Sequence, residues 1–225
     1  SAIEDEGAVK KVVSDSGTVY RSQAVILATG ASPRRLDIPG EDRLTGKGVS
    51  YCATCDGALF KGRTVAVIGG GDTAVGEAVF LTRFAEKVYL IHRRDAFRAS
   101  KILQERAFAN EKVSVLWNRA PVEIIGKDRV ESLLLRDTLS GGEETLLCGG
   151  VFVLAGTVPE SSFVKGLVSL DEKGYIITDS RMETSVPGIF SAGDVNKKDF
   201  RQVATAVGDG ANAAHFAEIY LENLK

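Results

Sequence analysis

Apolar residues occur in short continuous runs and in longer segments with a helical period. The short runs end in small residues or glycine and lie at residues 25–27, 65–68, 88–91 and 151–155. Such runs are typical of parallel strands buried on both faces. Helical spacing marks residues 73–84, 101–109 and 202–221. Strands that alternate with helices in this way predict an α/β fold.

Turn residues and alternating positions place the other expected elements. Residues 8–13 and 18–21 flank Asp15-Ser16-Gly17 and predict a hairpin. Further short strands are expected at 113–116, 122–125, 130–136, 175–177 and 189–192, with a turn at 171–174. Short apolar runs separated by turns, as in residues 1–36, return after Gly150. We therefore infer that one domain (37–150) is inserted into another (1–36 and 151–225).

Charge and apolar content exclude several classes of protein. The chain has 28 Lys and Arg against 30 Asp and Glu, so no global field favours nucleic acid. No apolar run approaches the roughly 20 residues that span a bilayer, and the amino end is acidic, unlike a signal peptide. A cytoplasmic protein without a membrane or nucleic-acid partner is expected.

A glycine turn follows the expected strand 65–68 and opens the expected helix. Residues Gly69 to Ala74 fit the pattern G-x-G-x-x-A, in which glycines allow close approach of a diphosphate to the helix start. The next strand ends at His92-Arg93-Arg94, and Arg98 follows. Arginines at this place suit a 2′-phosphate, which favours NADP over NAD. The alternative is a solvated basic patch.

Two of the three cysteines form a C-x-x-C, Cys52 and Cys55, followed by Asp56. Thiols at this spacing can close a disulfide and reopen it by exchange. The alternative, half of a zinc site, lacks further ligands at zinc spacing, so no metal is expected. Asp56 suits either a proton donor to a leaving thiolate or a turn residue. Cys148 is expected to be a buried apolar residue.

Taken in order, these motifs resemble the low-molecular-weight thioredoxin reductases of the pyridine nucleotide-disulfide oxidoreductase superfamily. The resemblance extends from Ala24 to about Glu218 and rests on VILATGAS, SYCATCDG, VAVIGGGDTAV, IHRRDAFRAS, GIFSAGDV and the pair Arg201-Gln202. It implies an NADPH-binding Rossmann-like domain inserted into a partial FAD-binding Rossmann-like domain. It also implies electron flow from NADPH through FAD to Cys52 and Cys55, then to a thioredoxin-like protein disulfide, in a homodimer.

The same resemblance assigns the site residues. Catalysis falls to the redox pair Cys52 and Cys55, with Cys55 nearer the flavin, and to Asp56 as the acid. NADPH is bound by Gly69, Gly71, Asp72, Thr73, Ala74, His92, Arg93, Arg94 and Arg98. FAD is bound by Thr29, Gly30, Gly193, Asp194, Arg201, Gln202 and Val203.

The chain departs from this family in two places that bear on function. Members open with a second glycine turn for the FAD diphosphate, and only one such turn is present here. We therefore expect these 225 residues alone to bind FAD weakly or not at all, and to lack NADPH-dependent disulfide reduction. Gly76 stands where the family commonly has glutamate. The alternatives are an NADPH-binding module without flavin or turnover, and a related reductase with another electron partner.

Overall fold

The computed structural model describes residues 2–224, and the chain forms two compact units within it. One unit is continuous and comprises residues 33–156. The other unit is made of residues 1–32 and 157–225. The chain therefore leaves the outer unit once, completes a whole inner unit and returns.

A five-stranded parallel sheet forms the centre of the inner unit. Its strands lie in the order β6 (Val49–Ser50), β13 (Gly150–Val153), β7 (Thr64–Ile68), β8 (Lys87–His92) and β9 (Val113–Trp117). In β7 four of the five residues are buried, as the apolar run predicts for a strand covered on both faces. All its neighbours run parallel, so the carboxyl ends of these strands meet at one edge.

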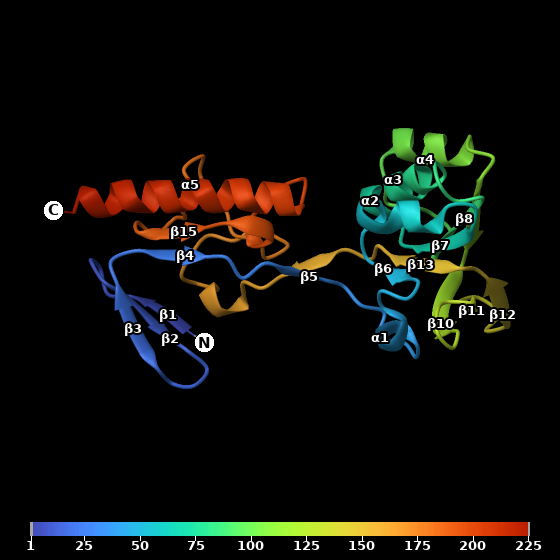
Figure 1. Cartoon of the computed structure of the whole chain (residues 1–225), viewed down its shortest axis with the longest axis horizontal. Helices are drawn as coiled ribbons and strands as arrows, with labels where there is room; N and C mark the ends of the chain where they lie inside the picture. The colour runs from blue at the N-terminus through green and yellow to red at the C-terminus, as the bar shows by residue number, and fades with distance from the viewer. Residues whose placement is uncertain (1, 225) are drawn as a thin grey trace. The chain divides into compact units, whose positions relative to one another are not determined.

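Helices cover one face of this sheet (Figure 1). They are α2 (Ala53–Asp56), α3 (Asp72–Leu81) and α4 (Lys101–Phe108). Helix α3 buries Ala74, Val75, Ala78 and Leu81, a helical stripe that packs with the side chains of alternate residues in β7 and β8. The small alanines let α3 lie close to the sheet, which fixes the glycine turn at its start.

The other face of the sheet packs on an antiparallel sheet. This second layer contains β10 (Arg119–Ile125), β11 (Ser132–Asp137), β12 (Glu143–Leu147) and the short helix α1 (Glu41–Leu44). Leu133 and Leu135 of β11 and Leu44 of α1 form a core with Ala66 and Ile68 of β7. Cys148 is buried in the same core.

Strand β13 corrects one expectation from the sequence. Residues 151–155 were expected in the outer unit, yet β13 pairs with β6 and β7 inside the inner sheet. Val151 and Phe152 are fully buried there. The inner unit consequently runs to Gly156, and it begins at Pro33 rather than residue 37.

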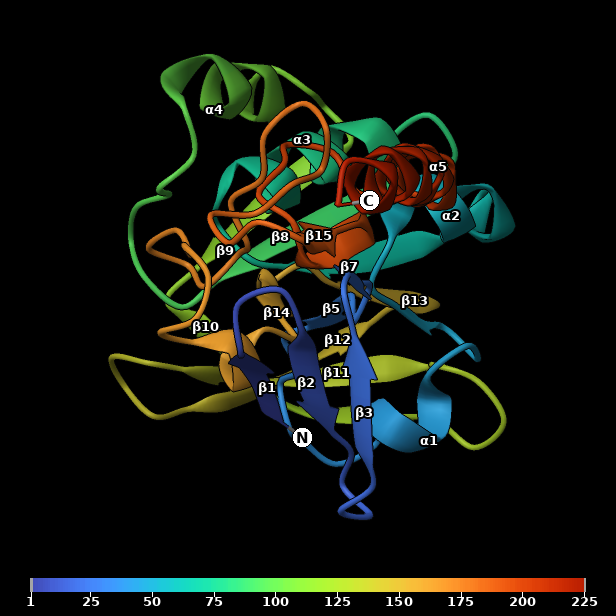
Figure 2. The ribbon, with the colours of Figure 1, turned by 90° about the vertical axis from the view of Figure 1, so that its left-hand side faces the viewer.

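The outer unit contains a three-stranded antiparallel sheet and a helix on a strand pair. Figure 2 shows the strands of the first sheet side by side: β1 (Ala2–Asp5), β2 (Lys10–Val13) and β3 (Val19–Ser22). The second part pairs β4 (Val25–Leu27) in parallel with β15 (Ile189–Ser191), beneath α5 (Val203–Glu222). Strands β5 (Ala31–Pro33) and β14 (Thr157–Pro159) pair where the chain crosses between units. The expected hairpin and parallel strand are confirmed.

One expected strand is absent from residues 2–224. Residues 175–177 do not form a continuous strand; Ile176 makes only isolated bridges to Leu170 and Asn196. The turn before it is present, because Gly174 N–H donates to the Asp171 carbonyl over 2.9 Å. Strands β1 and β12 were not expected. Strand β1 pairs with β2 and β12 pairs with β11, and most residues of β1 and β12 are exposed, so neither strand has a clear apolar pattern.

Candidate active site

Cys52 and Cys55 are joined by a disulfide with a Cα–Cα distance of 5.3 Å. Cys52 is the N-cap of α2, and its sulfur accepts a hydrogen bond from Cys55 N–H over 3.2 Å. The bond therefore closes one turn of helix. Among residues 2–224, Cys148 is the free cysteine, and burial raises the pKa of its thiol to about 12. The expected pairing and the expected burial of the third cysteine are both confirmed.

Polar contacts hold the disulfide turn from two sides. Ser50 Oγ donates to Asp56 Oδ2 over 2.7 Å and accepts from Cys52 N–H over 3.1 Å. On the other side, Glu77 Oε2 of α3 accepts from Ala53 N–H over 2.9 Å. Burial raises the pKa of Glu77, and the Ala53 N–H opposes that rise. Sequence reasoning gave no role to Ser50, although it is the first residue of SYCATCDG, or to Glu77, which lies outside the quoted motifs.

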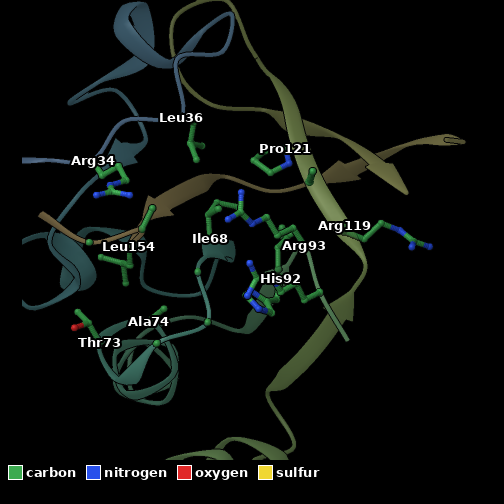
Figure 3. Close-up of a pocket in the computed structure, with 18 of the residues that line it drawn as sticks. Arg34, Leu36, Ile68, Thr73, Ala74, His92, Arg93, Arg119, Pro121 and Leu154 are labelled. Carbon is green, nitrogen blue, oxygen red and sulfur yellow. The ribbon is translucent and has the colours of Figure 1, made fainter. Parts of the chain in front are cut away.

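A pocket of about 530 Å³ lies at the carboxyl ends of β7 and β8 in the inner unit. Figure 3 shows the start of α3 on one side of it and the end of β8 on the other. It brings together most of the residues expected to bind NADPH: Gly69, Gly71, Thr73, Ala74, His92, Arg93, Arg94 and Arg98. The glycine turn and the end of β8, which are about 20 residues apart in the chain, thus meet at one cavity, as the motif spacing implied.

The glycine turn has the geometry of a cradle. A Cβ on Gly69, whose φ is +153°, would lie 2.5 Å from Ala74 Cβ and 2.6 Å from Leu154 O. A Cβ on Gly70 would lie 2.4 Å from the His92 ring. Gly71 differs, because its Cβ would meet nothing within 4 Å. The first two glycines permit close packing, and the third leaves open space before the N–H groups that begin α3.

Three cations and a neutral imidazole line the β8 side of the pocket. Arg93, Arg94 and Arg98 are exposed, and none has a side-chain hydrogen bond or ion pair within the described residues. His92 is 8% exposed, and its Nε2 is buried without a hydrogen-bond partner. Burial lowers the pKa of His92, and the three arginines lower it further, while a backbone hydrogen bond with Ala96 opposes this. The arginines thus supply the positive charge.

The pocket also has residues that the motifs did not reveal. Arg34, Arg35, Arg119 and Leu154 all line it. They come from segments before α1, from β10 and from the end of β13, which only tertiary folding brings to the glycine turn. Conversely, the carboxylate of Asp72 accepts from Ser100 N–H over 2.7 Å and so anchors the start of α4.

The remaining expected residues lie in the outer unit. Thr29 Oγ1 donates to the Glu160 carbonyl over 2.6 Å, and Gly30, with φ +76°, accepts from Glu160 N–H over 3.0 Å. These bonds hold the segment that follows β4. The positive φ explains the glycine, because other residues rarely adopt it.

A second group follows β15 and leads into α5. Gly193 N–H donates to Asp209 of α5 over 3.0 Å, and Asp194 Oδ1 is buried without a partner. The Arg201 guanidinium donates to the carbonyls of Asp194, Asn196 and Lys198. Gln202 caps α5, whose first residue, Val203, is 81% exposed.

Comparison with known proteins places this chain among disulfide oxidoreductases. A family model described as pyridine nucleotide-disulphide oxidoreductase matches residues 2–210. Thioredoxin reductases of Listeria innocua and Bacillus subtilis are each 49% identical over 221 residues, which is 98% of this chain and 69% and 70% of theirs. The crystal structure of thioredoxin reductase from Streptococcus pyogenes has a TM-score of 0.93 at 49% identity, covering 99% of this chain and 72% of that one. The structure of thioredoxin reductase from Giardia duodenalis gives 0.91 at 38% identity, covering 98% and 73%. The expected α/β fold class and the resemblance are both confirmed.

Proposed function

Because the chain belongs to the pyridine nucleotide-disulphide oxidoreductase family, we propose that it is the larger part of an NADPH-dependent flavoprotein disulfide reductase of the thioredoxin reductase type. The proposal rests above all on one observation. A disulfide on α2 and an arginine-lined pocket at the start of α3 belong to the same compact unit. A dithiol site and a nucleotide site are the two components that such a reductase needs.

The inner unit is the proposed NADPH domain. Gly71 leaves open space before α3, where oriented N–H groups suit a diphosphate. Arg93, Arg94 and Arg98 would hold the 2′-phosphate through charge-assisted hydrogen bonds. His92, held neutral by burial, would offer its unpartnered Nε2 without adding charge. The residues therefore fit the nucleotide.

The outer unit is the proposed FAD domain. Asp194 Oδ1 is buried and lacks a partner, a state that costs about 1–3 kcal/mol unless a donor arrives. A ligand hydroxyl would satisfy it. The exposed Val203 would gain apolar cover from the same ligand, and Thr29, Gly30, Gly193, Arg201 and Gln202 complete the proposed set. FAD, when bound, would supply two-electron transfer between NADPH and the disulfide.

The chemistry of this chain's own residues is thiol–disulfide exchange. Two electrons and two protons convert the Cys52–Cys55 disulfide into a dithiol. One thiolate attacks a protein disulfide, which gives a mixed disulfide and releases one partner thiolate. The second cysteine then attacks the mixed disulfide, which breaks the bond to the partner sulfur, releases the partner's second thiolate and restores the Cys52–Cys55 disulfide. Asp56, oriented by Ser50, is the proposed source of the proton for the leaving thiolate.

The partner is proposed from the relatives. Those compared are thioredoxin reductases, so a thioredoxin-like protein disulfide is the proposed acceptor. A homodimer stays a prediction from the sequence resemblance. No helix within residues 2–224 is long and apolar enough to cross a membrane. A cytoplasmic location stays a prediction from the sequence.

Spectroscopy and turnover test the proposal. The protein is incubated with FAD and desalted, and flavin absorbance and NADPH oxidation with a thioredoxin disulfide are then measured. Retained flavin and turnover that Cys55→Ser abolishes would support the reductase and would contradict the expectation that these residues alone bind FAD weakly. NADPH binding without retained flavin would agree with the weak flavin binding expected of these residues and favour the nucleotide-binding module. Failure to bind NADPH would refute both.

A further inference from the structure

Two adjacent arginines reach the nucleotide pocket from outside the glycine and β8 motifs. Arg34 and Arg35 follow β5, and both line the pocket. Their surroundings differ. Arg35 is paired with the carboxylate of Asp42, whereas the Arg34 side chain has neither an ion pair nor a hydrogen bond to any described residue. Arg34 therefore presents an uncompensated positive charge to the cavity.

The main chain fixes the place from which the Arg34 side chain extends. Arg34 N–H donates to the Gly156 carbonyl over 2.8 Å, which ties it to the segment after β13. Leu154 and Gly156 of that segment also line the pocket. Figure 3 shows Arg34 beside Leu154, on the side of the pocket where Thr73 and Ala74 begin α3. His92 and Arg93 lie at the other side.

The two sides of the pocket suit two different phosphates of one ligand. An NADPH molecule carries a 2′-phosphate at its adenosine end and a diphosphate between its two riboses. The β8 side already has three arginines for the first group. At the α3 side the glycine turn and the helix start offer N–H groups but no cation of their own. The carboxylate of Asp72, the first residue of α3, accepts a hydrogen bond from Ser100 N–H.

We propose that Arg34 is a binding residue for the diphosphate of the nucleotide. This inference rests on the proposed function and adds to it a cation that the family motifs do not contain. The β8 arginines then bind the 2′-phosphate, whereas Arg34 neutralises part of the charge of the diphosphate at the glycine turn. An arginine fork is suited to two phosphate oxygens at once.

A series of ligands separates the two phosphates. Adenosine 2′-phosphate carries only the first, adenosine 2′,5′-bisphosphate adds the 5′-phosphate, and NADPH has the full diphosphate. Dissociation constants are measured by titration calorimetry for the unmodified chain, Arg34→Gln, Arg129→Gln and Arg93→Gln. Arg129→Gln is the matched control, because it removes an exposed arginine of the same unit that lies outside the pocket.

Arg34→Gln should weaken NADPH and the bisphosphate by about three- to twentyfold, the size of a charged hydrogen bond reduced by solvent exposure. Adenosine 2′-phosphate should change by less than about twofold, and Arg34→Lys should restore part of the loss. Arg93→Gln should weaken all three ligands. Arg129→Gln should weaken none of them appreciably.

Three results would overturn the assignment of Arg34. They are an unchanged affinity of Arg34→Gln for the bisphosphate, an equal loss for all three ligands, and an equal effect of Arg129→Gln. In each, tight binding of NADPH by the unmodified chain leaves the proposed function standing. If the unmodified chain binds no ligand of the series, both the proposed function and the assignment of Arg34 to the diphosphate are refuted.

Discussion

Arg93 and Arg94 should determine the preference for NADPH over NADH. The test is the double substitution Arg93→Gln and Arg94→Gln. Both side chains line the pocket and have no partner among the described residues, so their charge is available to a ligand. His92 beside them does not compensate, because burial lowers its pKa and holds it neutral near pH 7.

The expected loss follows from the exposure of these side chains. A hydrogen bond to a charged group contributes about 1.5–3 kcal/mol when shielded, but exposed ion pairs contribute about 1 kcal/mol or less. Arg93 and Arg94 are exposed in the free chain and become partly covered when a phosphate sits between them. We therefore expect a combined loss of about 1–2.8 kcal/mol, a five- to hundredfold weaker Kd for NADPH.

Titration with NADPH and NADH in parallel measures this difference. NADH has no 2′-phosphate, so its Kd should change by less than about twofold, the usual scale of a surface substitution. The matched control is Arg106→Gln with Arg129→Gln, which removes two exposed charges of the same unit outside the pocket. Equal weakening of NADPH and NADH, or an equal effect of the control pair, would refute the assignment of these arginines to the 2′-phosphate.

Three further predictions concern stability and reactivity. Gly76→Ala should raise the free energy of unfolding by about 0.5–1 kcal/mol, because a Cβ there meets only Leu103 at 3.8 Å and alanine favours the helix; urea denaturation measures it, and a loss would show that the helix cannot accept the methyl group. Cys148, with a thiol pKa raised to about 12, should resist iodoacetamide at pH 8 in the folded chain, and mass spectrometry after mild reduction should find two alkylated cysteines, not three. The pKa of Glu77 is raised above its ordinary 4.5, so its contribution to stability is present below that pH and is lost as pH rises through the folded-state pKa. Glu77→Gln should remove this decline in a series of denaturation curves, and an unchanged decline would assign it to other groups.

Local sequence was sufficient for elements whose signal lies within one segment. The glycine turn, the two helices after it and the C-x-x-C all have their chemistry in consecutive residues. The structure confirms the elements because local propensity and tertiary packing agree there. The same holds for α5, which the sequence predicted within one residue at each end.

Strand β13 shows where local sequence fails. Its apolar run resembles that of β4, since each is short and is followed within three residues by glycine. Such a run predicts a parallel strand but contains nothing that selects one sheet over another. The choice depends on its pairing with β6 and β7, about 100 and 85 residues earlier in the chain. The domain boundary expected at Gly150 from the pattern of apolar runs therefore lies inside the inner unit, which extends to Gly156.

Some residues of the candidate site were missed for a related reason. Arg34, Ser50 and Glu77 are held by hydrogen bonds that form only on folding, and the sequence motifs do not record such contacts. Asp72 illustrates the reverse: the motif assigns it to the nucleotide, while its carboxylate is engaged by Ser100. Motifs predict which residues lie near a ligand. They are less informative about which side chains hold those residues in position.

The arrangement of the inner unit bears on how electrons reach the disulfide. Cys52, Cys55 and Asp56 do not line the nucleotide pocket, although all three share its unit. Transfer of a hydride needs reacting atoms about 3–3.5 Å apart. A nucleotide seated on the glycine turn with its 2′-phosphate at β8 is therefore not positioned by this pocket to reduce the disulfide directly. The proposed flavin would act as the intermediate two-electron carrier, and that part of the proposal rests on the half-buried Asp194, whose Oδ1 is buried without a hydrogen-bond partner among the described residues.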